Sequence, residues 1–254
     1  MQEIINKILE TSQGNQPCVI ATVVASSGSS PRKVGARMLV SFQGRLTGTV
    51  GGGSLEKLVE NDALAALKRR QSFLKTYALD KKAGLQVCGG RVSIFYDVVS
   101  PRRRLVIAGG GHIGMSLSLI GKLLGFEVIV IDNRREFAHK ARFPHADQVI
   151  CGRYEKALAK LGADEKTAIV IVTHGHLHDA SVLRTALKSK AGYIGMIGSK
   201  AKIRHIFRQM RSAGFSPGRL KEIYTPIGLD IGAETPQEIA VAIAAELIQE
   251  YRRS

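Results

Sequence analysis

The sequence predicts an α/β protein: a C-terminal Rossmann-like, doubly wound parallel sheet with an N-terminal mixed α+β domain. From residue 104 onward, short apolar strands alternate with helical segments, which is typical of a parallel sheet with right-handed crossovers. The turn GGGHIG follows the first of these strands and opens a helix. Before residue 100, strand-like segments follow one another through short turns, as they do in hairpins.

The N-terminal domain is expected to span residues 1–100. It begins with a helix predicted over residues 3–12, where apolar side chains recur at helical spacing. Strands are predicted in QPCVIATVVASS, RMLVSF and RLTGTV, and an amphipathic helix is predicted in GGGSLEKLVENDALAALKR. The strands SFLKTYAL and VSIFYDVV complete the domain, and SPRRR is expected to be a short linker.

The C-terminal domain is expected to span residues 104–254. The segment RLVIAGGGHIG is predicted to contain a strand, a glycine turn and a helix start, and further strands are predicted in EVIVIDNR, ADQVICG, TAIVIVTH and GYIGMIGS, with helical segments between them. Thr235 and Glu238 have the spacing of a capping box, and Pro236 lies in the first turn. We therefore expect a last helix that runs from there to the end of the chain and is packed against the domain.

The composition is that of a globular protein, with 44% hydrophobic and 23% charged residues. No apolar run reaches the roughly 18 residues of a membrane span, and the N-terminus lacks the pattern of a secretory signal. The three cysteines are far apart and form no CxxC pair, which argues against a disulfide framework and a zinc ribbon. We therefore expect a cytoplasmic protein that does not enter a membrane.

The chain is strongly basic, with a net charge of +16. Residues 1–98 carry 13 basic and 7 acidic side chains, and the remainder carries 24 and 14, so the excess is spread over both halves. Such a field favours nucleic acid, an acidic protein or a phosphorylated small molecule, although a solvated basic surface explains it equally well. Tryptophan is absent and aromatic residues make up only 6%, so we expect no nucleic-acid partner.

The motif GGGHIG contains Gly109, Gly111 and Gly114 at the G-x-G-x-x-G spacing. The first glycine permits the tight turn, the second lets the backbone approach a phosphate, and the third lets helix and strand pack closely. Asp132 lies at the end of the next strand, where an acid that binds a ribose is expected. Two interpretations of the motif remain open: it binds a dinucleotide, or the fold keeps its glycines only for packing. His112 adds a titratable side chain to the motif.

A histidine-rich loop, THGHLHD, follows the fourth strand of the predicted parallel sheet. Ligands bind beyond the carboxyl ends of such strands, so His174, His176 and Asp179 are candidate metal ligands. His178 belongs to the same loop and could also shuttle protons. The alternative is that these histidines only form local hydrogen bonds.

Further turns have the composition of anion sites. Gly51, Gly52 and Gly53 precede one helix, and Gly198, Ser199 and Lys200 precede another, so both turns could offer backbone N–H groups to a phosphate. The loop GSSPRKVG supplies Ser30 and Arg32, although it could be an ordinary polar turn. Cys88 is followed by two glycines, which is compatible with an accessible thiolate and also with a simple turn.

These motifs occur in a definite order between about residues 17 and 250. The series is GSSPRKVGARMLV, GTVGGGSLE, CGG, GGGHIG, VIDNR, RFPHAD, THGHLHD, YIGMIGSK and PIGLDIGAETPQEIAVAIAAEL. In this order it resembles the XdhC/CoxI family, the xanthine dehydrogenase accessory proteins. The sequence departs from the family pattern at Gly110, where alanine is common, and at Gly175 and His178 in the histidine loop.

The resemblance implies a protein that binds the molybdenum cofactor (molybdopterin), assists its sulfuration and inserts it into a xanthine dehydrogenase-type molybdenum hydroxylase. It implies a carrier or insertion chaperone more than a catalyst, and a cysteine desulfurase could be a second partner. The implied cofactor-binding residues are Ser30, Arg32, Gly51, Gly52, Gly53, Glu56, Cys88, Gly109, Gly111, His112, Gly114, Asp132, Gly198, Ser199 and Lys200. Cys88 is the implied residue for any sulfur chemistry.

Two alternatives accompany this hypothesis. The glycine motif and Asp132 would also suit an NAD(P)-dependent oxidoreductase, and Arg134 and Arg135 could then accept a 2′-phosphate. Two domains joined by a short linker could exchange across a homodimer, although no sequence feature decides this.

Overall fold

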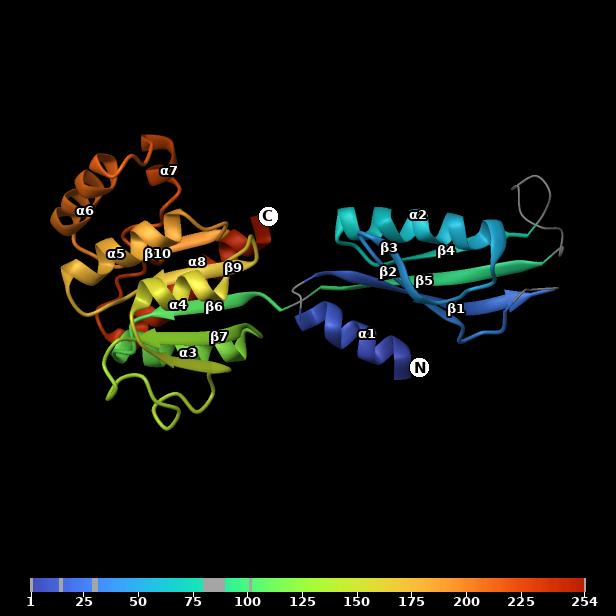
Figure 1. The fold of residues 1–254 in the computed structure, drawn as a ribbon, viewed down its shortest axis with the longest axis horizontal. Helices are drawn as coiled ribbons and strands as arrows, with labels where there is room; N and C mark the ends of the chain where they lie inside the picture. Colours follow the sequence, from blue (N-terminus) through green and yellow to red (C-terminus); the bar gives the residue numbers. More distant parts are fainter. Residues whose placement is uncertain (1, 14–15, 29–31, 80–89, 101, 254) are drawn as a thin grey trace. The chain divides into compact units, whose positions relative to one another are not determined.

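The computed structural model describes all residues except 1, 14–15, 29–31, 80–89, 101 and 254, and it leaves out the side chains of residues 12, 13, 176 and 177. The chain forms two compact units, residues 1–101 and residues 102–254 (Figure 1). Each unit has its own sheet and its own buried core. Among the described residues, no helix is both long and apolar enough to cross a membrane.

The first unit contains a five-stranded antiparallel sheet with the strand order β3-β2-β1-β5-β4. Its elements, in chain order, are α1 (Gln2–Gln13), β1 (Cys18–Ser27), β2 (Arg37–Ser41), β3 (Gly44–Gly48), α2 (Gly53–Arg69), β4 (Phe73–Ala78) and β5 (Arg91–Val99). Helix α2 buries Leu55, Val59 and Ala63, which recur every four residues, against the sheet. The prediction of a mixed N-terminal part is confirmed.

The second unit contains a five-stranded parallel sheet with the order β10-β9-β6-β7-β8. Its elements, in chain order, are β6 (Arg104–Ala108), α3 (His112–Leu123), β7 (Glu127–Asp132), β8 (Gln148–Cys151), α4 (Tyr154–Leu161), β9 (Thr167–Ile171), α5 (His176–Leu187), β10 (Tyr193–Met196), α6 (Lys200–Ser212), α7 (Pro217–Lys221) and α8 (Pro236–Arg253). This arrangement confirms the Rossmann-like prediction.

Helices cover both faces of the parallel sheet. Helices α3 and α8 bury Leu117, Ile243 and Leu247 in the core on one face, and α4, α5, α6 and α7 contribute to the core on the other. Strands that are covered on both faces need apolar side chains on both sides. This explains why the five strand segments are nearly continuous apolar runs in the sequence.

The start of α8 has the geometry that its sequence predicts. The Thr235 hydroxyl accepts a hydrogen bond from the Glu238 N–H at 3.2 Å, and the Glu238 carboxylate accepts one from the Thr235 N–H at 3.0 Å. The backbone N–H groups of Thr235 and Glu234, which both donate to this carboxylate, lower the pKa of Glu238. The capping box is therefore confirmed.

Cys18 and Cys151 have different environments. Cys18 lies in β1, and its burial raises the pKa of the thiol, as expected for an inert core cysteine. Cys151 ends β8 and is exposed.

Candidate functional site

A crevice is expected where the order of the parallel strands reverses. Strand β6 lies between β7 and β9, so the loops that leave β6 and β9 diverge to opposite faces of the sheet. The first loop contains Gly109–Gly111 and leads to α3, and the second contains Thr173–Gly175 and leads to α5. The glycine motif and the histidine loop, far apart in the sequence, are thus neighbours at this edge.

Two glycines let the loops approach each other and the helix. Gly109 has a φ of +127°, and a Cβ added to it would lie 2.2 Å from the Val172 carbonyl oxygen. A Cβ at Gly114 would lie only 2.0 Å from the Gly109 carbonyl oxygen. Gly109 therefore provides the tight turn, and Gly114 lets the first turn of α3 pack on it.

The N-termini of α3 and α5 lack side-chain caps. Their N-cap residues are Gly111 and Gly175, and neither helix start has a hydrogen bond from an N-cap side chain. No heavy atom lies within 4 Å of a Cβ added to either glycine, so space is open at both positions. Uncapped backbone N–H groups at a helix start attract anions.

Asp132 lies at the end of β7 and is fully buried. Its carboxylate accepts hydrogen bonds from the Gly110 N–H at 2.7 Å, from the Arg134 N–H at 2.9 Å and from Nε and a terminal nitrogen of Arg134, each at 3.0 Å. Burial raises the pKa of Asp132, but the hydrogen bonds and charge of Arg134 and the Gly110 N–H outweigh it and hold the pKa below its usual value. Asp132 thus anchors the glycine loop to β7.

The segment after β7 packs against the same loop. The Arg134 guanidinium lies 3.8 Å from the centre of the Phe137 ring, and Arg142 Nε donates to the Gly110 carbonyl oxygen at 3.0 Å. A Cβ at Gly110 would lie 2.4 Å from the Phe137 carbonyl oxygen. The alanine that is common in the family would therefore not fit here without a shift of the backbone.

The titratable residues of the histidine loop lie in different environments. His174 is exposed, whereas Asp179 is fully buried, accepts a hydrogen bond from the Thr173 hydroxyl and forms an ion pair with Lys202. His178 Nε2 lies 3.3 Å from the Asn133 amide nitrogen, and its ring packs on Tyr154. The His176 side chain lies outside the described residues.

No group of three or more His, Cys, Asp or Glu side chains that could hold a metal is found in the part of the chain that the structure describes. Asp179, one of the three proposed ligands, already has a cationic partner. Because the His176 side chain lies outside the described residues, the three-residue metal site stays a prediction.

The turn before α6 presents a different lysine from the expected one. Ser199 is the N-cap and accepts a hydrogen bond from the Lys202 N–H at 3.3 Å, beside Gly198. Lys200 is exposed at the helix start, whereas the Lys202 side chain is largely buried against Asp179. The sequence pattern favours Lys200 because it follows the glycine turn, and it does not mark Lys202, whose partner is 23 residues away.

Replacing Lys202 should therefore cost stability, whereas replacing Lys200 should not. We expect Lys202→Met to lower the free energy of unfolding by about 2–3 kcal/mol, because it leaves the Asp179 carboxylate buried without its cation. Lys200→Met should change it by less than about 0.5 kcal/mol. Urea unfolding followed by circular dichroism measures both variants, and equal losses would show that the Asp179–Lys202 pair is unimportant.

Next to the glycine turn of the first unit lies a carboxylate of the protein itself. Glu56, in the first turn of α2, forms an ion pair with Arg45 and accepts a hydrogen bond from the Thr49 hydroxyl. Burial raises the pKa of Glu56, but Thr49, Arg45 and the backbone N–H groups of Gly52 and Val50 together lower it. The Gly52 N–H of this turn and the Val50 N–H before it thus face a carboxylate, where the sequence suggests a phosphate.

The remaining predicted residues of the first unit are only partly described. Arg32 is exposed in the loop before β2. Ser30 and Cys88 lie outside the described residues.

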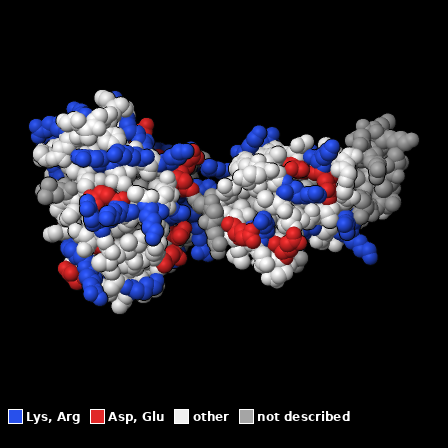
Figure 2. Space-filling model, in the orientation of Figure 1, with Lys and Arg blue, Asp and Glu red and all other residues white. Residues whose placement is uncertain are grey.

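The basic excess is visible on the surface. Figure 2 shows Lys and Arg scattered over the visible face of both units, not gathered in one patch. This matches the even distribution of charge along the sequence.

Two family models match this chain. The model described as the XdhC Rossmann domain matches residues 105–247, and that of the XdhC and CoxI family matches residues 12–78. The first covers the parallel sheet with its glycine motif and histidine loop. The second covers β1, β2, β3 and α2 with the turn at Gly51–Gly53.

Individual proteins are similar as well. The uncharacterized protein YqeB of Escherichia coli is 32% identical over 97% of this chain, and a Bacillus subtilis protein named as a probable xanthine dehydrogenase component is 33% identical over 63%. The chain spans 46% and 47% of these two relatives, about half of their length. The E. coli molybdenum cofactor insertion chaperone PaoD is 22% identical over 96% of this chain and 86% of its own.

One solved structure is similar over nearly the whole chain. It is the crystal structure of a xanthine dehydrogenase from Bacillus halodurans, with a TM-score of 0.57 and 25% sequence identity. The similarity covers 97% of this chain and 95% of the other.

Proposed function

Since this chain belongs to the XdhC and CoxI family, we propose that it is an accessory protein for a xanthine dehydrogenase-type molybdenum hydroxylase. In this proposal it binds the molybdenum cofactor as cargo, assists its sulfuration and helps to insert it into the client enzyme. The similarity to a protein named as a molybdenum cofactor insertion chaperone supports this role. A cysteine desulfurase remains a proposed sulfur donor.

The observation that carries the proposal is the anion site at the switch point of the parallel sheet. Helices α3 and α5 both begin there with glycine N-caps that have no side-chain cap and open space around them. The two buried carboxylates nearby, Asp132 and Asp179, are each paired with a cation. They therefore repel a bound anion much less than free carboxylates would.

Molybdopterin carries a phosphate at one end and a dithiolene at the other. The phosphate fits the N-terminus of α3 at Gly111 and His112, where backbone N–H groups and the helix dipole favour negative charge. Lys200 is exposed at the start of α6 and could add positive charge, and His174, exposed on the loop before α5, could add a hydrogen bond. Cys88 stays a proposed thiolate for the sulfur end, because soft ligands suit molybdenum that bears sulfur.

A carrier role agrees better with these contacts than acid–base catalysis does. A general acid or base must exchange a proton with a substrate within hydrogen-bond reach. The carboxylates of Asp132 and Asp179 are fully buried and already paired with Arg134 and Lys202. Acid–base catalysis by these two carboxylates is therefore disfavoured, whereas the N–H groups at the glycine N-caps of α3 and α5 suit an anion.

The alternative function, an NAD(P)-dependent oxidoreductase, is disfavoured, because the residues that suggested it already bind each other. The Asp132 carboxylate already accepts four hydrogen bonds, about as many as its oxygens can take, so a ribose hydroxyl would have to displace one. Arg134, the candidate partner of a 2′-phosphate, donates three of them and stacks on Phe137. The site thus favours a ligand that presents a phosphate to α3 over a dinucleotide held through its ribose.

Replacing Gly111 by aspartate tests both the cargo and its site. Gly111 has a φ of −68°, and the space around it is open, so a side chain fits. Aspartate is a good N-cap, and we expect its carboxylate to occupy the free N–H groups and repel a phosphate while α3 stays folded. After co-expression with the enzymes of molybdopterin synthesis, the purified variant should retain about tenfold less pterin, or less still, than the wild type. Oxidation followed by pterin fluorescence measures this.

Gly152→Asp is the matched control. Gly152 follows β8 at the same edge of the sheet and also has open space around it, but it lies away from the switch point. This variant should retain pterin like the wild type. Wild-type protein without pterin would refute the carrier function, whereas full retention by Gly111→Asp would refute only the placement of the phosphate at α3.

A further inference from the structure

The net charge of the second unit comes from one continuous stretch of its sequence. Residues 180–221 contain ten Lys and Arg side chains and no Asp or Glu. The rest of residues 99–254 contains 14 basic and 14 acidic side chains, so it has no net charge. The whole excess of this half of the chain therefore lies on the stretch that forms most of α5 and all of β10, α6 and α7.

Most of these cations lie on α5, α6 and α7, three helices that pack on the same face of the sheet (Figure 1). Two of the ten have acidic partners, because Lys202 pairs with Asp179 and Arg219 pairs with Glu222. The other eight are exposed, and none of them forms an ion pair with a residue that the structure describes. This face of the unit is therefore strongly and openly basic.

Three of the exposed cations form a line along α6. Arg204, Arg208 and Arg211 recur at intervals of four and three residues, which places them on one side of the helix, and we call them the arginine stripe. The stripe is about 10 Å long, because a helix rises about 1.5 Å per residue. Like charges at this spacing repel one another, and α6 contains no acidic residue to offset them. The stripe thus weakens its own helix, which favours a role in binding.

Two hollows lie on either side of Arg208. One, of about 560 Å³, lies between α5 and α6, and Arg184 and His205 contribute to its lining. The other, of about 450 Å³, is lined by Ile203, Phe207 and the three arginines of the stripe. Ile203 is buried and Phe207 is half-buried, so the second hollow offers apolar surface between guanidinium groups. Arginine beside aromatic surface is a combination enriched at protein–protein interfaces.

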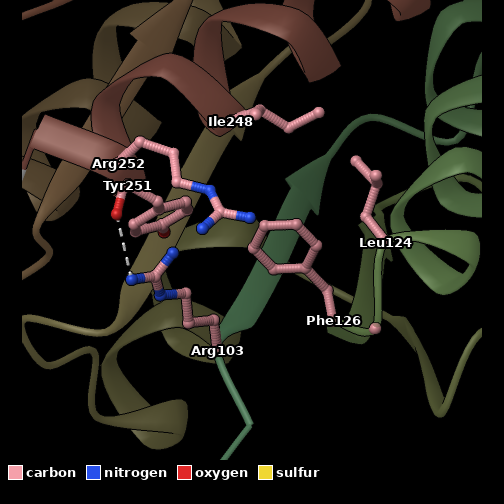
Figure 3. A pocket seen from close by; sticks show the side chains of 7 residues that line it. Arg103, Leu124, Phe126, Ile248, Tyr251 and Arg252 are labelled. Carbon is pink, nitrogen blue, oxygen red and sulfur yellow. Dashed lines mark hydrogen bonds between the residues drawn. The ribbon is translucent and has the colours of Figure 1, made fainter. Parts of the chain in front are cut away.

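Several arginines elsewhere in the second unit have partners within the protein. Figure 3 shows Arg103 in a hollow of about 320 Å³, where it donates to the Tyr251 carbonyl oxygen at 3.2 Å and lies 4.0 Å from the centre of the Tyr251 ring. Arg134 pairs with Asp132 in the crevice. The guanidinium groups of the arginine stripe form no hydrogen bond or ion pair with any residue in the described ranges, so they are available to a partner.

An acidic protein segment suits this surface better than a membrane or a nucleic acid does. A helix that binds a membrane surface inserts exposed apolar side chains, and residues 180–221, all of them described, have no exposed large apolar side chain. Single-stranded nucleic acid needs exposed aromatic rings for stacking, and the aromatic residues of this stretch are buried or half-buried. The phosphate backbone of a duplex has no apolar side chain to place beside Phe207.

We propose that the arginine stripe binds an acidic segment of a partner protein, whose carboxylates pair with the arginines and whose apolar side chains enter the hollow beside Phe207. A guanidinium binds a carboxylate through two parallel hydrogen bonds, so three arginines in line select carboxylates at a matching spacing. The stripe is too long for one phosphate group to bridge. The inference goes beyond the proposed function, because it involves neither the crevice nor the cargo.

Fluorescence anisotropy of a labelled peptide, titrated with the full chain, tests the proposal. The peptide has about 16 residues, with glutamate at every third or fourth position and leucines between them. The triple variant Arg204→Gln, Arg208→Gln and Arg211→Gln should raise its dissociation constant about tenfold or more at about 50 mM salt. The three positions are exposed, and removing the like-charge repulsion should leave α6 folded.

The triple variant Lys57→Gln, Lys68→Gln and Arg69→Gln is the matched control, because it removes three exposed positive charges from α2 of the first unit. It should change the dissociation constant by less than about twofold. Arg208→Lys keeps the charge but loses the planar guanidinium, so it should weaken binding about threefold. Equal losses in the two triple variants would overturn the proposal, because net charge alone would then explain the binding.

Further probes identify the class of partner. A peptide with serine in place of leucine should bind about threefold more weakly, because the hollow then receives no apolar side chain. A DNA duplex of about 20 base pairs and vesicles that contain phosphatidylserine should lose less affinity than the peptide when the stripe is replaced. A larger loss for either of them would assign the stripe to that class of partner and overturn the proposal. Absence of peptide binding to the wild type at about 100 µM would overturn it as well.

Discussion

Replacing Gly114 by alanine is expected to lower the free energy of unfolding of the second unit by about 4 kcal/mol. The new Cβ would lie 2.0 Å from the Gly109 carbonyl oxygen, and about 1 Å of backbone movement is needed to relieve that contact. Gly109 cannot yield easily, because it is itself held against Val172 of the neighbouring loop. The rate of hydrogen exchange of the β6 and α3 amides, measured against urea concentration, reports the loss for this unit alone.

Gly111→Ala is the control in the same motif. Its Cβ would meet no heavy atom within 4 Å, and the φ of −68° suits any residue, so the loss should stay below about 1 kcal/mol. Similar losses for the two variants would contradict the assignment of close packing to Gly114 and of open space to Gly111.

Replacing Asp132 by alanine is expected to cost about 3–5 kcal/mol. The change removes the acceptor of four hydrogen bonds and leaves the Arg134 guanidinium without its carboxylate and the Gly110 N–H without an acceptor. It also releases the glycine loop from β7. Thermal unfolding followed by circular dichroism measures the loss, and Glu136→Ala, on the exposed side of the same segment, is the control.

The same residue makes stability depend on pH. The folded-state pKa of Asp132 lies below its ordinary value of about 3.9, so the carboxylate stabilises the fold fully above that value. This contribution is lost as the pH falls from about 3.9 through the folded-state pKa. Asp132→Asn should therefore lose less stability than the wild type between pH 5 and pH 3. If the free energy of unfolding changes with pH in the same way for the two proteins, Asp132 does not contribute to the pH dependence of stability.

Local patterns were sufficient to predict most of the fold. Apolar runs bounded by glycine and polar turns predicted β6, β7, β8, β9 and β10, and their alternation with helices predicted that the strands are parallel. The capping box at Thr235 and Glu238 predicted the start of α8 to the residue. These features depend on neighbours within a few residues, which is the range over which a sequence pattern can be interpreted.

For the candidate site, the sequence predicted the backbone geometry but not the roles of the side chains. The glycine motif predicted a tight turn at Gly109, space for a ligand at Gly111 and close packing of helix and strand at Gly114. The backbone has these geometries at all three positions. The side-chain roles differed, because Asp132 pairs with Arg134 instead of facing a ribose, and Lys202 instead of Lys200 turns inward. No pattern in the sequence marks those partners, because several cations lie within reach of each carboxylate along the chain.

What the amino-acid sequence establishes here is therefore the set of elements, the parallel direction of the C-terminal strands and the glycine turns at their carboxyl ends, since short-range periodicity and sterics decide these. The charge state of the crevice depends on which residues of distant segments meet. Packing of whole helices against the sheet selects those pairs, and only the folded structure shows that the buried carboxylates are neutralised while two helix N-termini stay open.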